Sequence, residues 1–387
     1  MSQYELLELV NVPWSLFRGL LPQKLTFSRE SKQRQVQDLT QKQPFRFEFM
    51  FEAIFWYCLW MVIAPIMVFS IKDLLNNDEL RFSYSFGFLG CSNFMTWALA
   101  SVTILVAKMT GHEGRLGITK VNIKWRYGWG LGVLQALEVG LGARMLELVS
   151  VTLRTEVRML VPLFQYAGGL ALGLERLQAQ LVFCILVLAA GGCLAVTGSI
   201  SPENASDGLP LLLIATGSLS ISVTKWALCQ HWLAPHGSAE RPSALVMLCR
   251  MALTSSLCGF LAAAILEPDM YEGGLTALPR PGAVFGRLLM IGAIVLVMSS
   301  AEIRAVQLTS ALTFAVLQPL HNLIVILADQ LMGGGRPLSG LAWIGCLLCF
   351  LAAVKYAEER NASAKKQHMT AEPLLSAEAG GPSEPGK

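Results

Sequence analysis

The chain has 387 residues, of which 53% are hydrophobic and 15% are charged, and its mean hydropathy is +0.51. A soluble domain averages about 45–50% apolar and about 25% charged residues, so this composition argues against a soluble domain and indicates a membrane protein. The net charge of +3 is small, and no basic patch is interleaved with aromatic residues, which excludes an obvious nucleic-acid partner.

Ten segments are apolar over the roughly 20 residues that a membrane-spanning helix needs. In chain order they are 50–70, 86–107, 128–148, 151–173, 179–198, 209–230, 243–266, 284–304, 308–331 and 338–357. Charged residues interrupt the fourth and the eighth. The sequence therefore predicts an all-α polytopic membrane protein with about ten transmembrane helices.

The segments outside the spans are polar. Residues 1–49 are mixed in charge and lack the apolar core and cleavage site of a secretory signal peptide, so the first span is expected to act as an uncleaved targeting signal. The ten spans form one domain over 50–357, with approximate halves at 50–200 and 208–357. Residues 358–387 are rich in Ala, Gly, Pro, Ser and Glu, which predicts a disordered tail.

Basic residues indicate the orientation, because short cytosolic loops carry an excess of Lys and Arg. They gather before the first span, between the second and third, and after the tenth, for example at Arg46, Lys124 and Lys355. With ten spans these segments share one side, so both termini are predicted to be cytosolic. Asn204 in an N-x-S sequon would then face the lumen or the exterior, and Asn361 in another would face the cytosol.

The chain lacks the motifs of an enzyme or a metal site. The P-loop, H-E-x-x-H and G-x-S-x-G patterns are absent, so we expect no enzymatic activity. Cys346 and Cys349 form a C-x-x-C pair inside an apolar span, without a second pair to complete a zinc site. The nine cysteines are expected to be small buried hydrophobic residues, and no cofactor, metal or disulfide framework is predicted.

A weak internal repeat relates the two halves at an offset of 160 residues. The matches pair Ser150 with Ser310, Gly173 with Gly333 and Arg176 with Arg336. Because each half holds five spans, an odd number, the second half would be inverted relative to the first. Inverted repeats are typical of alternating-access transporters that bind their substrate near the bilayer midplane.

Ionisable residues inside the predicted spans are candidates for function. A charge at mid-bilayer costs about 2.5–3.5 kcal/mol on insertion scales, so such residues are expected to face a partner or a hydrated cavity. The candidates are Glu138, Arg144, Arg154, Glu156, Arg158, Lys225, Arg250, Glu302, Arg304 and His321.

Arg154 and Arg158 are four residues apart and share a helix face. One interpretation is a cationic stripe that binds phosphate, because a guanidinium group matches phosphate oxygens in a bidentate fork. The alternatives are an ion pair of Arg158 with Glu138 or Glu302, and snorkelling of Arg154 toward the surface. Glu302 is interpreted as a member of a structural ion pair.

Two further pairs are candidates for the same site. Lys225 is either a second anion contact or a snorkelling side chain, and Trp226 either stacks on a base or serves as packing or an interfacial anchor. His321 and Asn322 can hydrogen-bond a sugar or a phosphate, or can be satisfied by neighbouring residues.

Five segments carry a family resemblance. They are ALEVGLG at 136–142, VTLRTEVRMLVPLF at 151–164, GLERLQAQLVFCILVLAAGG at 173–192, VTKWALCQ at 223–230 and AEIRAVQLTSALT at 301–313. They resemble the triose-phosphate and nucleotide-sugar translocators of the drug/metabolite transporter superfamily (solute carrier family 35 type), and within them the GDP-fucose-transporter-like branch. The resemblance covers roughly residues 50–357.

The resemblance implies ten helices, an alternating-access cavity and exchange of a phosphorylated sugar or nucleotide sugar whose phosphate binds cationic residues. Thr155 and Arg158 hold the positions of a Thr-Lys pair of the family. His321 stands where the ninth helix usually has Lys, and Ala143 and Ile71 replace Asn residues. These departures point away from plastid-type sugar-phosphate exchange.

We therefore expect a transporter that moves a nucleotide sugar into a Golgi or endoplasmic-reticulum lumen in exchange for a nucleotide monophosphate. The residues expected to bind it are Arg158, Lys225, Arg154, Thr155, His321, Asn322 and Trp226. The expected partners are a phosphorylated small molecule and the lipid bilayer, and a homodimer is left open. The alternatives are a sugar-phosphate/phosphate translocator, a neutral or zwitterionic metabolite carrier, and a non-transporting modulator of glycosylation.

Overall fold

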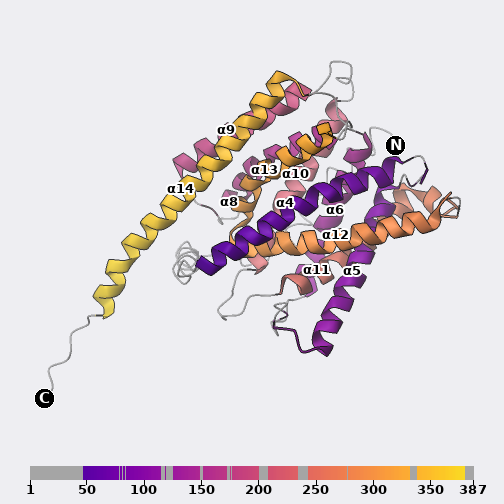
Figure 1. Cartoon of the computed structure of the whole chain (residues 1–387), viewed down its shortest axis with the longest axis horizontal. Helices are drawn as coiled ribbons and strands as arrows, with labels where there is room; N and C mark the ends of the chain where they lie inside the picture. The colour runs from indigo at the N-terminus through magenta and orange to yellow at the C-terminus, as the bar shows by residue number, and fades with distance from the viewer. Residues whose placement is uncertain are drawn as a thin grey trace.

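The computed structural model describes residues 47–379 apart from 78, 81, 83, 115–117, 119–124, 149–150, 172–174, 176, 200–207, 234–242, 277 and 332–337. Every regular element within that part is helical, as the sequence predicts (Figure 1). The N-terminal segment up to residue 46, Asn204 and the glycine and arginine pairs of the internal repeat lie outside the described residues.

The bounds of the helices follow the predicted segments closely. The long helices are α4 (Phe47–Asn76), α5 (Ser85–Met109), α6 (Trp125–Leu148), α9 (Ala179–Ser199), α10 (Gly208–Leu233), α11 (Ala244–Leu266), α12 (Pro281–Leu308), α13 (Ala311–Leu331) and α14 (Gly340–Ala379). The shorter elements are α7 (Val151–Val157), the 3₁₀-helix η1 (Arg158–Leu160), α8 (Val161–Ala171) and the 3₁₀-helix η3 (Pro268–Met270).

Six of these helices are long and apolar enough to cross a membrane. They are α4, α5, α11, α12, α13 and the first part of α14, over Gly340–Arg360. The other four predicted segments are also helical. It stays a prediction that they span the bilayer.

The fourth predicted span, 151–173, is not one continuous helix. It is divided into α7, η1 and α8, and the break falls at Arg158. Pro162 explains the break, because proline has no N–H to donate to the carbonyl group four residues before it, which is that of Arg158. The N–H of Val161 donates to this carbonyl oxygen instead, which is the tighter bond of a 3₁₀ turn.

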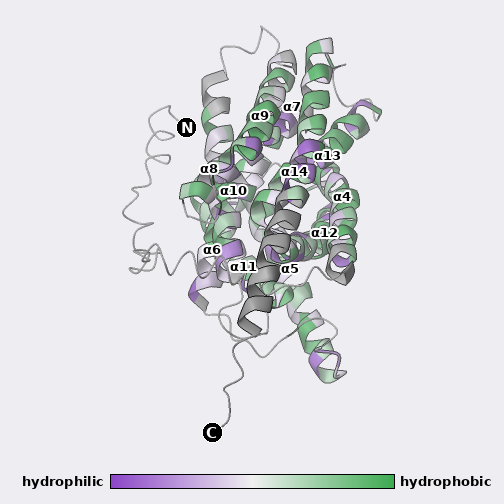
Figure 2. Cartoon of the chain, turned by 90° about the vertical axis from the view of Figure 1, so that its left-hand side faces the viewer, coloured by the Kyte–Doolittle hydropathy of each residue, from purple (hydrophilic) through white to green (hydrophobic). Residues whose placement is uncertain are grey.

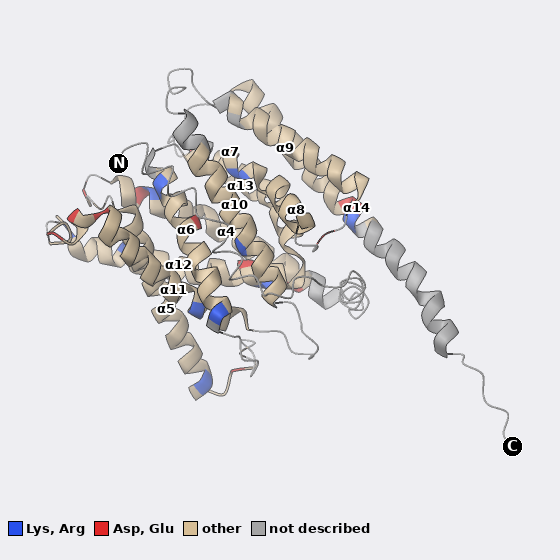
Figure 3. Ribbon diagram, turned by 180° about the vertical axis from the view of Figure 1, so that it is seen from behind, with Lys and Arg blue, Asp and Glu red and all other residues tan. Residues whose placement is uncertain are grey.

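The outer surface of the bundle is apolar. Large hydrophobic side chains such as Phe55, Val62, Leu105, Phe183 and Leu347 are each more than half exposed. Hydrophobic residues cover most of the helix length in Figure 2, and long stretches of helix in Figure 3 carry no charged residue. Soluble monomers rarely expose so much contiguous apolar area, so this surface fits a lipid environment.

The helices of the two halves pack on one another across the whole bundle. α9 lies along α14 at one edge (Figure 1), α5 packs on α11, and α8 packs on α13. α4 packs on α12 and α6 on α10, while α5 also contacts α12 and α6 also contacts α11. The resulting interior places α6, α10, α12 and α13 around the candidate site.

The C-terminal helix is longer than the sequence predicts. α14 continues to Ala379, whereas composition predicted a disordered tail over 358–387. The segment after residue 357 is also rich in Ala, Glu and Lys, which are strong helix formers, and it extends a helix that packing against α9 has already nucleated.

Two glycines permit the close approach of α9 and α14. A Cβ atom on Gly345 would lie 2.5 Å from the carbonyl oxygen of Gly191 and closer still to the backbone nitrogen of Ala195. A Cβ atom on Gly191 would lie 2.8 Å from the carbonyl oxygen of Gly345. Because the neighbouring atoms belong to backbone, a larger residue must push the two helices apart.

We expect Gly345→Ala to lower the free energy of unfolding by about 1–3 kcal/mol, the usual cost of overpacking. Thermal unfolding in detergent measures the effect. Gly340→Ala on the same helix is the matched control, because a Cβ atom there has no neighbour within 4 Å. Equal melting temperatures of the two variants would contradict this account of the α9–α14 contact.

Candidate functional site

A buried cluster of polar and charged side chains joins α6, η1 and α10. The Nζ atom of Lys225 lies 2.5 Å from Oε2 of Glu138, and Nη2 of Arg158 lies 3.3 Å from Oε1 of Glu138. Ser222 Oγ donates a hydrogen bond of 2.8 Å to Glu138 Oε1, and Lys225 Nζ donates one of 2.8 Å to Gln135 Oε1. We refer to these five residues as the Glu138 cluster.

The cluster compensates charge deep inside the bundle. Lys225 is 4% exposed, so it does not snorkel to the surface, and Glu138 is 5% exposed. Arg158 is more open, with 30% of its side chain exposed. A buried charge without a partner is strongly destabilising, which explains why one carboxylate lies between two cations. With two cations and one carboxylate, the cluster retains one excess positive charge.

A small cavity lies against the cluster toward the start of α6. It is lined by Leu131 and Gln135 of α6, Trp226 and Cys229 of α10, Glu302 of α12 and other residues. It has room for about one water molecule.

A second cavity of similar size lies toward the end of α6. Its lining includes Gly142 and Met145 of α6, Arg154, Arg158, and Ser218 of α10. The two arginines therefore face the same cavity, as their spacing in the sequence suggests.

Helical spacing shows that the cluster separates the two cavities. Leu131, Gln135, Glu138, Gly142 and Met145 follow one another at intervals of three or four residues, so they lie along one face of α6. A site for a drug-sized ligand has a volume of roughly 300–1,000 Å³, far more than either cavity offers. Neither of these two cavities therefore has room for such a ligand in this conformation.

Arg154 and Thr155 are both buried in α7. Arg154 is 8% exposed, and its Nε atom has no hydrogen-bond partner among the described residues. The hydroxyl group of Thr155 donates a hydrogen bond of 2.7 Å to the carbonyl oxygen of Val151 in its own helix. The Nε atom of Arg154 is thus a free donor on a side chain that lines the second cavity, whereas the hydroxyl proton of Thr155 is already used in a hydrogen bond.

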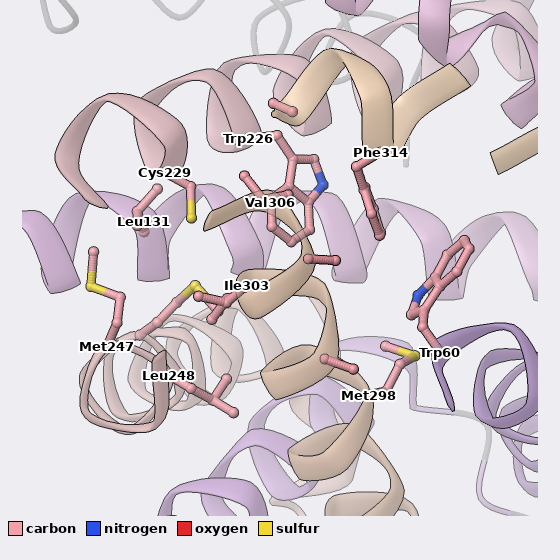
Figure 4. Close-up of a cluster of buried hydrophobic side chains, with 14 of the residues drawn as sticks. Trp60, Leu131, Trp226, Cys229, Met247, Leu248, Met298, Ile303, Val306 and Phe314 are labelled. Carbon is pink, nitrogen blue, oxygen red and sulfur yellow. The ribbon is translucent and has the colours of Figure 1, made fainter. Parts of the chain in front are cut away.

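A chain of aromatic rings leads from the Glu138 cluster to His321. Lys225 Nζ lies 4.2 Å from the centroid of the Trp226 ring, a cation–π contact. Ring centroids are 5.5 Å apart between Trp226 and Phe314, 4.9 Å between Phe314 and Trp60, and 4.4 Å between Trp60 and His321. Figure 4 shows Phe314 between the two tryptophans.

Glu302 makes a hydrogen bond instead of the ion pair that the sequence suggested. Trp60 Nε1 donates a hydrogen bond of 2.8 Å to Glu302 Oε1. Among the described residues, no Lys or Arg lies at ion-pair distance from this carboxylate. The Trp60 indole is itself buried, at 2% exposure, and connects α4 to α12 at this point.

His321 and Asn322 lie together on α13, at 7% and 3% exposure. His321 Nδ1 lies 3.2 Å from Asn322 Oδ1. His321 Nε2 and Asn322 Nδ2 have no hydrogen-bond partner within the part of the chain that the structure describes. Buried polar atoms normally find a partner, so these two atoms mark a place where a ligand or water can bind.

The sequence alone did not identify Gln135, Ser222 and Trp60 as members of this region. Gln135 and Ser222 each precede a buried charged residue by three positions, which places each pair on one helix face. That spacing is a signal that was present in the sequence. Trp60 carries no such signal, because a tryptophan within an apolar span does not by itself indicate a polar contact.

We expect Trp60→Phe to lower the free energy of unfolding by about 1.5–3 kcal/mol, because it removes a hydrogen bond to a buried carboxylate. Trp56→Phe is a matched control on the same helix, since Trp56 Nε1 makes a longer contact of 3.4 Å with the half-buried Glu52. Unfolding of both variants in detergent measures the difference. A loss no larger for Trp60→Phe than for Trp56→Phe would show that the Glu302 contact contributes little.

Comparisons with known proteins establish the fold alone. No family model matches the chain, and no curated protein matches it. It is similar to a solved structure described only as "Crystal structure of protein", with a TM-score of 0.54 and 17% sequence identity. That similarity covers 80% of this chain and 97% of the other.

Proposed function

We propose that this protein is a membrane transporter that exchanges a nucleotide sugar for a nucleotide monophosphate by alternating access, in a Golgi or endoplasmic-reticulum membrane. The observation that carries the proposal is the buried Glu138 cluster, in which two cations share one carboxylate inside an apolar bundle, together with Arg154, which faces the adjacent cavity. The resemblance of the motifs to nucleotide-sugar translocators supports the same substrate class.

The charges favour an anionic substrate. Arg158 and Lys225 share the single carboxylate of Glu138, and Arg154 faces the cavity beside them. A phosphate monoester, as in a nucleotide monophosphate, carries a charge of about −1.5 to −2 at neutral pH and accepts several charge-assisted hydrogen bonds. Binding of such a group compensates the excess positive charge.

The surrounding residues suit the rest of such a substrate. Trp226 lines the first cavity with an aromatic ring, and aromatic rings stack on nucleobases of any kind. His321 Nε2 and Asn322 Nδ2 are polar atoms to which sugar hydroxyl groups can hydrogen-bond. Phosphate, base and sugar therefore each have a candidate contact within one connected region.

Helix packing supports two related halves. If α7, η1 and α8 count as one helix, each helix has a counterpart in the other half, five places away along the chain. Each helix of a contact can then be replaced by its counterpart. The contact of α4 with α12 then becomes that of α10 with α6, α5 with α12 becomes α11 with α6, and α4 with α13 becomes α10 with α8. Two five-helix repeats produce this pattern, and an odd number of spans makes them inverted.

The closed conformation suits an intermediate of alternating access. The Glu138 cluster separates a cavity toward the start of α6 from one toward its end. We predict that α6 spans the bilayer with its start on the cytosolic side, because basic residues such as Lys124 precede it, and the two cavities would then lie toward opposite sides of the membrane. Transport then requires the bundle to widen one cavity at a time.

We expect Arg158→Ala to reduce exchange in proteoliposomes by about tenfold or more, since a charge-assisted contact to phosphate contributes about 1.5–3 kcal/mol. Arg158→Lys should retain more activity than Arg158→Ala, because the positive charge remains. It should be less active than the wild type, because lysine cannot bind phosphate in a bidentate geometry. Arg126→Ala, at an exposed position, is the control. Unchanged exchange by well-folded Arg158→Ala protein contradicts the proposal.

Thermal stability of the purified protein identifies the substrate class, because a ligand that binds only the folded state raises the melting temperature. We expect stabilisation by one nucleotide sugar and its matching monophosphate. Stabilisation by sugar phosphates alone would favour a sugar-phosphate translocator, and by neutral metabolites alone a neutral-metabolite carrier. Stabilisation by none of these would favour a non-transporting membrane protein.

A further inference from the structure

We propose that Glu138 is an internal counter-anion, which occupies the cationic site in the empty transporter and is displaced by the phosphate of the substrate. This inference rests on the proposed function and assigns a role within it to a residue that does not itself bind the substrate. Glu138 is thus a positioning residue that sets both the affinity for anions and the ability of the empty site to close.

The contacts of Glu138 are those that a bound phosphate would need. One carboxylate oxygen faces Lys225 at 2.5 Å. The other accepts a hydrogen bond from Ser222 at 2.8 Å and lies 3.3 Å from Arg158. Two cations and a hydroxyl group form a donor set for an oxyanion, and in this conformation the protein's own carboxylate takes it.

The position of Glu138 makes competition unavoidable. It lies on the face of α6 between Gln135, beside one cavity, and Gly142, beside the other. A ligand that passes from one cavity to the other must therefore pass the carboxylate. A phosphate and a carboxylate on the same two cations would repel each other, so binding of the phosphate weakens the contacts of Glu138.

The competition also affects the empty transporter. With Glu138 in place, Arg158 and Lys225 remain partly compensated after the substrate leaves, and the bundle can close around them. Without the carboxylate, the buried Lys225 and the more open Arg158 would lack an anionic partner until another anion bound. Glu138 therefore sets the ratio of two rates: the rate at which the empty protein changes conformation, and the rate at which it exchanges one anion for another.

Glu138→Gln tests the inference through affinity. We expect the variant to bind inorganic phosphate, GMP, UMP or CMP about tenfold more tightly than the wild type in thermal-shift titrations, a factor within the usual range of coupled sites. A purely structural role of Glu138 predicts weaker binding. Glu52→Gln is the control, since it removes a carboxylate that pairs with Arg304 at 2.7 Å, away from the cluster, and should leave affinity unchanged.

A second readout compares two fluxes in proteoliposomes loaded with the monophosphate that binds. We expect Glu138→Gln to lower net efflux into anion-free buffer about tenfold relative to exchange. If Glu138→Gln does not fold, Glu138→Asp replaces it in both measurements. The aspartate side chain is one methylene group shorter, so its carboxylate reaches the two cations less well. The Glu138→Asp variant should therefore also bind the anion more tightly than the wild type.

The outcomes separate this inference from the proposed function. Equal or weaker anion binding by the Glu138 variants, or an unchanged ratio of net efflux to exchange, overturns the role of Glu138 while a loss of exchange in Arg158→Ala still supports transport. If none of the four anions binds to the wild type, the proposed function fails and the counter-anion role fails with it.

Discussion

Compensation of charge inside an apolar bundle is the constraint on which the centre of this structure depends. Lys225 of α10 and Glu138 of α6 lie far apart in sequence and meet at 2.5 Å. Neither side chain could remain charged in such a place without an ionic partner, because removal of a charge from water costs several kcal/mol. The pair therefore fixes the rotation of α6 against α10, and with it the residues that face the two cavities.

The backbone supplies the third member of this arrangement. Pro162 prevents a continuous helix and leaves a 3₁₀ turn at Arg158, between α7 and α8. Irregular backbone at membrane depth is tolerated where it is buried in protein or lines a hydrated cavity. The break is placed where the guanidinium of Arg158 reaches Glu138, so the local chemistry of one proline positions a residue of the candidate site.

The sequence predicted the positions of the helices well, because a spanning segment must be apolar over a fixed length. It also selected Arg158 and Lys225, because charges are rare in such segments. It offered the ion pair of Arg158 with Glu138 as an alternative, and the structure has that pair. It missed that Lys225 shares Glu138 and that Trp60 contacts Glu302, because hydropathy does not encode which helices are neighbours or how each is rotated. Pro162 was a signal for the 3₁₀ turn, but average hydropathy over a span of about 20 residues does not register the effect of one proline.

The distribution of polar contacts distinguishes two helix pairs that the proposed repeat would relate to each other. α4 and α12 are joined along their length, by the pair Glu52 and Arg304, the Trp60–Glu302 hydrogen bond, and the pair Asp73 and Arg287. The polar contacts identified between α6 and α10 gather instead at the Glu138 cluster. An anion that replaces Glu138 would loosen the second pair and leave the first intact. The proposed exchange of ionic partners would therefore act on one helix interface, that of α6 and α10, which faces both cavities.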